Sequence, residues 1–249
     1  MRRALVLCGT KGIGLGVARC LAASGDAVTV TGRDAIRAAE VAEDLPGTGH
    51  HSFACDFGDP RRVGDLVAEN GPYDVVLLNT PGFGPGTVEQ LSGEQLDEAV
   101  RSMLLSVRSA VEACLPSMKS NRWGRLIGIT STSLSVPIGG LAGSTIARAA
   151  VQAYLKLLAE SVGRYGITVN HVLPGKIDTD RLRVVEAATA ERLGRSAGSV
   201  RGEVLETIPL GRYGTPQDIG ELVTFLASDR AAYITGTGIR CDGGYLKPA

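Results

Sequence analysis

The sequence predicts a single α/β domain built on a doubly wound parallel sheet of about seven strands, with helices on both faces. Short apolar runs rich in β-branched residues recur along the chain, and segments with helical spacing lie between them. No linker-like stretch interrupts the 249 residues, so we expect one domain over 1–249. Strands that alternate with helices form parallel sheets, because each helix returns the chain to the same edge.

Seven runs have the composition of strands that are buried on both faces. They are residues 4–8, 27–31, 51–55, 74–78, 125–130, 167–172 and 234–241. Helical spacing occupies the intervals between them. The predicted helices are 12–24, 34–45, 60–69, 92–118, 143–164 and 216–227. Ser92 and Gln95 predict a capping box at the start of the helix over 92–118.

One polar segment, residues 181–206, breaks the alternation between the sixth strand and the last helix. Insertions beyond the carboxyl ends of strands often cover the substrate in such folds, so we expect 181–206 to be a substrate-covering insertion. Its arginines either form a solvated helical face or meet an anionic substrate. They are Arg181, Arg183, Arg192, Arg195 and Arg201.

Composition argues against several classes of function. The 26 Lys and Arg balance 26 Asp and Glu, so the chain has no basic excess for nucleic acid. Five scattered cysteines and three histidines show no ligand spacing, which argues against disulfides and a metal site. The first apolar run, residues 4–8, is too short for export, and no apolar run is long enough to span a membrane. We expect a cytoplasmic protein that binds neither nucleic acid nor membrane.

A glycine-rich turn, "LVLCGTKGIGLG", joins the first strand directly to the first helix. Backbone N–H groups and the positive helix end face outward at such a junction, and glycine lets a pyrophosphate approach closely. The spacing alone is also compatible with a plain tight turn. The prediction is a Rossmann-type dinucleotide site whose first contacts are Gly9, Thr10, Lys11, Gly12, Ile13 and Gly14.

The end of the second strand indicates which dinucleotide binds. A site for NAD places an acidic residue there to accept hydrogen bonds from the ribose hydroxyls, but this chain has Gly32 followed by Arg33. An arginine fork suits a 2′-phosphate, and Lys11 adds a second positive charge. The sequence therefore favours NADP(H) over NAD(H).

Over its full length the chain resembles the short-chain dehydrogenases/reductases. The resemblance is carried by the glycine turn, "CDFGD", "LNTPG", "GRLIGITS", "ITVNHVLPGKIDTD" and "IPLGRYGTPQDIGELVTFLASDRAAYITGTGIRCDGG". It implies further coenzyme contacts at Asp56, Phe57, Asn79, Thr80, Pro81, Pro174, Gly175, Ile177 and Thr179. It also implies a homo-oligomer, a tetramer or dimer, formed through the helices over 92–118 and 143–164.

The same resemblance locates the catalytic positions. Ser131 matches the family's serine, while Ser144 stands at the position of its tyrosine, Arg148 at that of its lysine and Met103 at that of its asparagine. An aliphatic hydroxyl is a far weaker acid than a phenol, and arginine cannot shuttle a proton. Tyr154 lies on a different helical turn and does not replace the missing phenol. The proton would then come from water, Ser144 or the substrate, with Ser131 polarising the carbonyl and Arg148 holding the ribose.

Together these observations predict an NADP(H)-dependent oxidoreductase for a small carbonyl or alcohol, with an atypical active site. Two alternatives stay open. One is a redox-neutral enzyme, such as an isomerase or cyclase, that uses the same pocket. The other is an NADP(H)-binding protein without catalysis.

Overall fold

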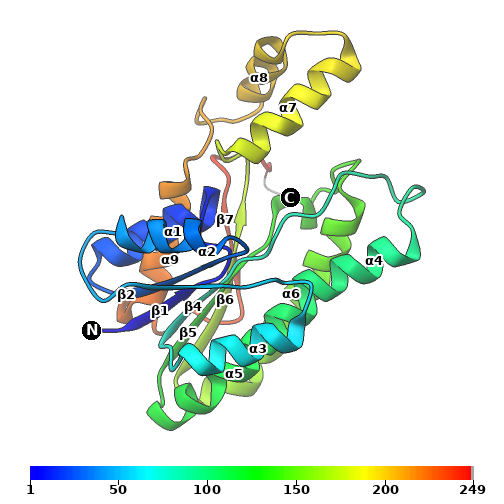
Figure 1. Cartoon of the computed structure of the whole chain (residues 1–249). Helices are drawn as coiled ribbons and strands as arrows, with labels where there is room; N and C mark the ends of the chain where they lie inside the picture. Colours follow the sequence, from blue (N-terminus) through cyan, green and yellow to red (C-terminus); the bar gives the residue numbers. More distant parts are fainter. Residues whose placement is uncertain (248–249) are drawn as a thin grey trace.

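Within residues 1–247, seven parallel strands form one sheet. This computed structural model describes those residues apart from the side chain of Ala188. The strands are β1 (Arg3–Val6), β2 (Ala27–Gly32), β3 (His51–Ala54), β4 (Val75–Leu78), β5 (Gly124–Ile129), β6 (Ile167–Pro174) and β7 (Gly238–Cys241). Their order in the sheet is β3-β2-β1-β4-β5-β6-β7 (Figure 1). The chain reverses direction across the sheet between β1 and β4, where such folds open a crevice.

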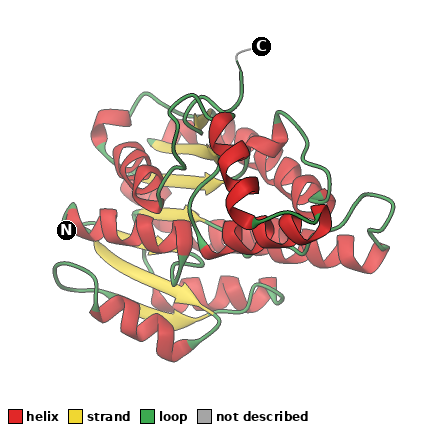
Figure 2. Ribbon diagram, turned by 90° about the horizontal axis from the view of Figure 1, so that it is seen from above, coloured by secondary structure: helices red, strands yellow, loops and turns green. Residues whose placement is uncertain are grey.

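Helices cover both faces of the sheet (Figure 2), which confirms the doubly wound fold. They are α1 (Gly12–Ala23), α2 (Ala35–Glu43), α3 (Pro60–Asn70), α4 (Gly93–Val100), α5 (Ser106–Asn121), α6 (Ala142–Val162), α7 (Asp180–Leu193), α8 (Ala197–Glu206) and α9 (Pro216–Ala227). No helix in the described part of the chain is both long enough and apolar enough to cross a membrane.

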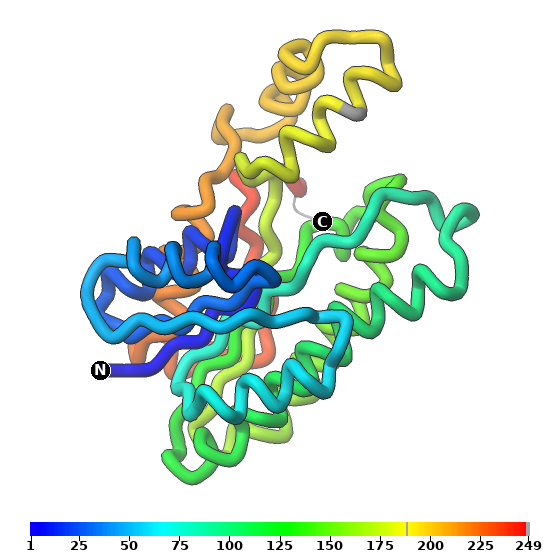
Figure 3. The backbone as a smooth tube through the Cα atoms, viewed as in Figure 1, coloured from blue at the N-terminus to red at the C-terminus, as the bar shows by residue number. Residues whose placement is uncertain are grey.

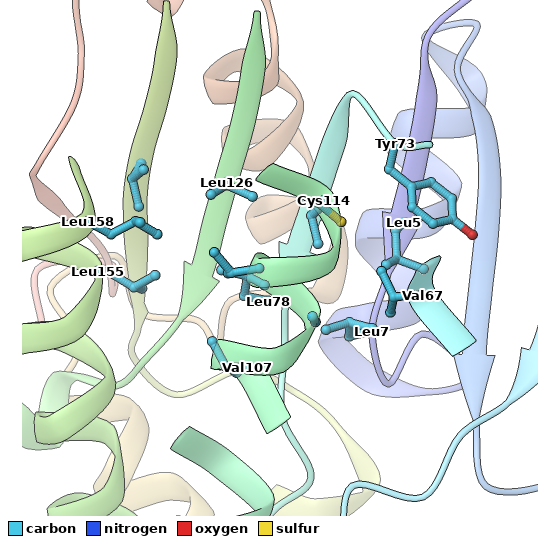
Figure 4. Packing of buried hydrophobic residues seen from close by; sticks show 14 of the residues in the cluster. Leu5, Leu7, Val67, Tyr73, Leu78, Val107, Cys114, Leu126, Leu155 and Leu158 are labelled. Carbon is cyan, nitrogen blue, oxygen red and sulfur yellow. The ribbon is translucent and has the colours of Figure 1, made fainter. Parts of the chain in front are cut away.

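Alternate residues of each central strand supply two separate cores, because successive strand side chains point to opposite faces. Leu5 of β1 and Leu7 just after it pack with α3, α5 and α6, whereas Ala4 and Val6 of β1 pack with α1, α2 and α9. Figure 4 shows part of the first core, in which Leu78 lies between residues of the sheet and α5. This two-sided burial holds the carboxyl ends of β1, β4, β5 and β6 in fixed positions.

Two predicted strands differ from the expectation of burial on both faces. β3 and β7 form the edges of the sheet, and each has exposed residues, at His51 and Ala54 in β3 and at Gly238 and Arg240 in β7. β7 also begins four residues later than predicted, because Gly236 (φ +72°) turns the chain just before it. Strand order, which decides burial, is not encoded in any one run of residues.

The helix predicted over 92–118 is interrupted. It begins with the predicted capping box, in which Ser92 Oγ accepts from Gln95 N (3.2 Å) and Gln95 Oε1 accepts from Ser92 N (3.0 Å). A π-helical turn, η1 (Arg101–Leu105), then separates α4 from α5. Such turns widen a helix locally and occur often at functional sites. Met103 lies inside this turn.

The predicted insertion over 181–206 is helical. It contains most of α7 and all of α8, which project beyond the sheet away from the other helices (Figure 3). α7 follows the end of β6 after a short loop, with Thr179 as its N-cap residue. The insertion therefore starts at the carboxyl edge of the sheet.

Candidate active site

The glycine turn after β1 is held by close backbone packing. Cys8 and Gly12 both have left-handed backbone angles (φ +51° and +52°). A Cβ atom at Gly14 would collide with the carbonyl oxygen of Cys8, so the helix can approach the turn only with glycine there. Asn79, at the end of β4, donates from Nδ2 to the same oxygen of Cys8 (3.2 Å). The structure thus brings Asn79 to the glycine turn, as a shared coenzyme site requires.

The N-terminus of α1 faces outward without a side-chain cap. Its N-cap residue, Lys11, makes no capping hydrogen bond, and the first turn carries no acidic residue. In α2, by contrast, Asp34 accepts from the N–H groups of Ile36 and Arg37. The first N–H groups of α1 and the positive end of its dipole are therefore available to an anion.

The side chain of Thr10, in the glycine turn, restricts which residue can stand at position 32. A Cβ atom at Gly32 would lie 2.5 Å from Cγ2 of Thr10, so an acidic residue has no room at this position while Thr10 keeps its place. Arg33 and Lys11 are exposed, and neither forms an ion pair within residues 1–247. Burial raises the pKa of the Cys8 thiol to about 12, while Arg33 and Lys11 act on it in the opposite direction. Both positive charges therefore lie close to the glycine turn.

At the ends of β3 and β4 the predicted residues differ in exposure. Asp56 is exposed, and its Oδ1 accepts from Gly58 N (2.9 Å). Phe57 is only 3% exposed, and its ring packs in the core against α3 and α5, so it presents no side chain to a coenzyme. Thr80 is buried and Pro81 is half-buried.

The end of β6 lies beside the glycine turn. Thr179 is close enough to Gly12 that a Cβ atom there would contact its Cγ2 at 3.5 Å. Gly175 packs against Asp242, and its N–H donates to the carbonyl oxygen of Cys241 (3.0 Å). Ile177 is buried in the second core, so its side chain supports the loop.

Pro174, the last residue of β6, accepts through its carbonyl oxygen from Thr132 Oγ1 (3.2 Å). This bond joins the end of β6 to the segment that follows β5. The predicted residues of β5 and β6 therefore meet at the same edge of the sheet.

The two candidate serines differ in what their hydroxyl groups contact. Ser131 Oγ accepts from Ser133 N (3.0 Å), which leaves its own proton free to donate. Thr145 at the start of α6 donates to Ser133 Oγ (3.4 Å), so Ser131 is tied to the helix that carries Ser144. Ser144 is 1% exposed, and its hydroxyl donates to the carbonyl oxygen of Leu141 (3.2 Å).

Arg148 lies one helical turn beyond Ser144. Its Nε atom is buried and has no hydrogen-bond partner within the described chain. Burial, and after it the positive charge of Arg181, lower the pKa of Arg148 to about 10. Met103 is fully buried beside Ala147, so this position supplies packing rather than a polar group.

The sequence analysis assigned no individual role to two side chains near these elements: it named Arg181 only as one of five arginines in the insertion, and Lys176 only within a longer motif. Arg181, in the first turn of α7, donates from Nη2 to the carbonyl oxygen of Phe83 (2.9 Å), in the loop after β4. Lys176 lies over the ring of Tyr245 (5.5 Å), and burial lowers the pKa of its amine. Neither residue forms a motif by itself, so only its contacts with distant segments of the chain distinguish it.

The tyrosine nearest to Ser144 along α6 is Tyr154, which is half-buried. Tyr154 packs against the first core, and burial raises the pKa of its phenol to about 12. The next largest influence on it is Glu112 of α5, which acts in the same direction. This group is therefore a poorer acid than an ordinary tyrosine.

An open cleft of about 770 Å³ runs between the starts of α1, α7 and α9. It includes Gly12 and Thr179 but none of Ser131, Ser144 and Arg148. This cleft thus borders the coenzyme residues from the α1 side and does not reach the catalytic candidates.

Comparisons with known proteins agree over almost the whole chain. The model of the enoyl-(acyl carrier protein) reductase family matches residues 8–246. The chain is 32% identical over 245 residues to the 3-oxoacyl-(acyl-carrier-protein) reductase FabG of Escherichia coli (strain K12), covering 97% of this chain and 96% of that protein. It is 29% identical over 255 residues to the D-beta-hydroxybutyrate dehydrogenase of Cupriavidus necator, covering 98% of each.

The crystal structure of YwfH, an NADPH dependent reductase involved in bacilysin biosynthesis, is similar with a TM-score of 0.93 and 26% identity, covering 100% of this chain and 99% of that one. The family match, the full-length relatives and the shared fold lead to one assignment. The chain belongs to the short-chain dehydrogenase/reductase family of oxidoreductases.

Proposed function

We propose that this protein is an NADP(H)-dependent oxidoreductase that acts on a small carbonyl or alcohol. Two exposed cations near the glycine turn, Lys11 and Arg33, support this choice of coenzyme. Beside them, Thr10 leaves no room for a side chain at Gly32. A 2′-phosphate would neutralise these charges, whereas the ribose hydroxyls of NAD would find no acid. The relative YwfH, named as NADPH dependent, supports the same choice.

The residues present fit such a coenzyme. The uncapped start of α1 and the glycine turn would hold its diphosphate, Asp56 its adenine, and the segment from Pro174 to Thr179 its nicotinamide end. When bound, the reduced nicotinamide supplies the hydride. Phe57 would contribute at most backbone groups, because its ring is in the core.

On the substrate side, Ser131 would donate a hydrogen bond to the carbonyl oxygen, since its Oγ already accepts from Ser133 N and its proton is free. Ser144 and Arg148 would stand where relatives carry a tyrosine and a lysine. Ser144 is a poor proton source, because it is buried and its hydroxyl is bonded to Leu141. We therefore assign the proton to water or to the substrate, and to Arg148 the positive potential beside the developing alkoxide and a hydrogen bond to the ribose.

We also propose that α7 and α8 cover the substrate. Val184, Val185 and Leu193 of α7 are exposed, and such apolar surface can close over a bound molecule. A homo-oligomer, a dimer or tetramer, remains our proposal for the assembly. Exposed apolar side chains on the helices concerned, Leu105 beside α5 and Leu157 on α6, support it. Light scattering on the purified protein tests the assembly.

The coenzyme proposal is tested by calorimetric titration with NADPH and with NADH. The single tryptophan, Trp123, directly precedes β5 at the opposite edge of the sheet, so calorimetry is a better reporter than its fluorescence. Arg33→Gln removes hydrogen bonds to a charged phosphate, so we expect NADPH binding to weaken about 10- to 100-fold. Arg37→Gln is the matched control, because Arg37 is exposed on α2 and paired with Glu40.

Binding of NADH with none of NADPH would overturn the coenzyme assignment. A panel of small carbonyl compounds then measures coenzyme oxidation. Coenzyme binding without oxidation would favour the two alternatives, and conversion of a compound without coenzyme oxidation would separate the redox-neutral enzyme from the non-catalytic protein.

A further inference from the structure

Arg148 is a half-buried cation without a counter-ion in the described part of the chain. Its Nε atom is inaccessible to solvent and has no hydrogen-bond partner, and no carboxylate within the described residues forms an ion pair with it. Leaving a buried charged group unpaired is costly, so such a group commonly has a partner that binds to the protein.

A second arginine is directed to the same place from another element. Arg181 extends from α7 to the loop after β4, where Nη2 binds the carbonyl oxygen of Phe83. Nη1 lies against Gly82, so closely that a Cβ atom there would collide with it. Glycine at 82 is therefore what lets this guanidinium reach the loop.

Packing brings the two arginines together. Phe83 packs against the small cluster that contains Ala147, the residue before Arg148, and a Cβ atom at Gly143 of α6 would lie 2.8 Å from the Phe83 ring. The carbonyl oxygen of Phe83 is the acceptor for Arg181. The charge of Arg181 also helps to lower the pKa of Arg148, as expected for like charges held close together.

The carboxylates of this region are engaged elsewhere. Asp178 pairs with Arg183 (3.2 Å) and Arg201 (3.1 Å), and Asp180 pairs with Arg183 (3.0 Å). Glu186 pairs with Arg201 (3.5 Å) and accepts from Tyr213. None of these three carboxylates pairs with Arg181, and Arg181 forms no ion pair within the described residues.

We propose that Arg148 and Arg181 together bind the carboxylate of the substrate, which is then a small oxo acid or hydroxy acid rather than a neutral carbonyl compound. This rests on the proposed function for the reacting end of the molecule, where Ser131 meets the carbonyl oxygen. Planar guanidinium groups bind carboxylates through paired hydrogen bonds, which fixes orientation as well as charge. The carboxylate would hold the substrate from the side of α6 and α7. One carboxylate against two guanidinium groups leaves a net positive charge for the alkoxide, and Arg148, with five N–H donors, would keep one for the ribose.

The test measures binding without turnover. Protein saturated with NADP⁺ is titrated by calorimetry with acetoacetate and 2-oxobutanoate, and with the methyl ester of each. We expect each acid to bind about 10- to 100-fold more tightly than its ester, as for hydrogen bonds to charged groups. Arg181→Gln should abolish this difference and leave the Kd of NADP⁺ within about twofold.

Arg192→Gln is the matched control, because Arg192 is exposed in the last turn of the same helix. It should leave the acid preference intact. A second readout guards against a merely structural effect: the acids should raise the Tm of the wild-type protein and of the control but not that of Arg181→Gln.

Three results would overturn the carboxylate site: esters that bind as tightly as acids, no binding of either acid, or an Arg181→Gln variant that loses NADP⁺ affinity instead of the acid preference. The last would assign Arg181 to the diphosphate of the coenzyme. Failure of the proposed function has a different signature, in which the acids bind to a protein that shows no affinity for NADP⁺ or NADPH.

Discussion

The contact between Gly32 and Thr10 gives a quantitative test of the reasoning about coenzyme choice. A Cβ atom at Gly32 would lie 2.5 Å from Cγ2 of Thr10, whereas carbon atoms in ordinary contact are about 3.5–4.0 Å apart. Gly32→Ala therefore requires a displacement of about 1 Å or more in a buried strand end. Overpacking of this kind costs about 1–3 kcal/mol.

Shortening Thr10 should relieve most of that cost. Thr10→Ala removes the colliding methyl group, and the remaining Cβ atom would lie 3.4 Å from the new one. We expect a coupling energy of about 1–2 kcal/mol between the two positions. The double variant Thr10→Ala/Gly32→Ala should therefore be more stable than Gly32→Ala alone.

Thermal unfolding of the four proteins in the cycle measures this coupling. In a chain of this size about 1 kcal/mol shifts Tm by about 2–4 °C, so Gly32→Ala should lower Tm by about 2–12 °C and the second substitution should restore most of the loss. Effects that simply add would refute the claim that Thr10 keeps position 32 free of a side chain. It would also follow that an acid at position 32 could be accepted without a change at Thr10.

Three further predictions concern stability and reactivity. Gly166→Ala should lower the free energy of unfolding, measured in urea, by about 1–3 kcal/mol or more, because φ is +72° and a Cβ atom would collide with a carbonyl oxygen of the loop before β5. Gly202→Ala, in open space on α8, should instead raise the free energy of unfolding by up to about 1 kcal/mol. Equal losses in the two variants would contradict this. Arg212 holds the pKa of the Asp218 carboxyl well below its usual range. The resulting stability is present above the ordinary Asp pKa of about 4 and is lost as the pH falls below it, so Asp218→Asn should flatten the acid limb of a plot of Tm against pH, and an unchanged limb would argue against the pair. Burial raises the pKa of the half-buried Cys8 to about 12, so this thiol should resist iodoacetamide at pH 8 in the folded protein, and rapid alkylation found by mass spectrometry would contradict the raised pKa.

The sequence predicts the architecture well because the signal for it is local. The composition of each run predicts its strand, and all seven predicted strands are present among residues 1–247. Errors occur where the outcome depends on position in the sheet. The runs at 51–55 and 234–241 resemble the buried strands in composition, yet they form the two edge strands of the sheet. The π-helical turn at η1 was also missed, because apolar spacing of three and four continues through it.

The arginines of the insertion show the same limit at the site. Of the two readings of these residues, a solvated face suits Arg183, Arg195 and Arg201, which pair with acidic residues near or within the same two helices. Arg181 differs only because its partner, the Phe83 carbonyl, is 98 positions away in the chain. No pattern of neighbouring residues encodes such a contact, so only the folded chain separates this arginine from the others.

The hydroxyl groups at Ser131 and Ser144 lead to a consistent view of how a site of this composition can work. A phenol at the second position would donate a proton to the developing alkoxide, but Ser144 gives its proton to Leu141. Arg148 stays protonated at neutral pH even with its pKa lowered to about 10, so its charge would be permanent during the hydride transfer that we propose. A fixed positive charge in a desolvated site stabilises an alkoxide without transferring a proton. The need for an acid of matched pKa is thereby reduced, because the alkoxide can persist until water protonates it.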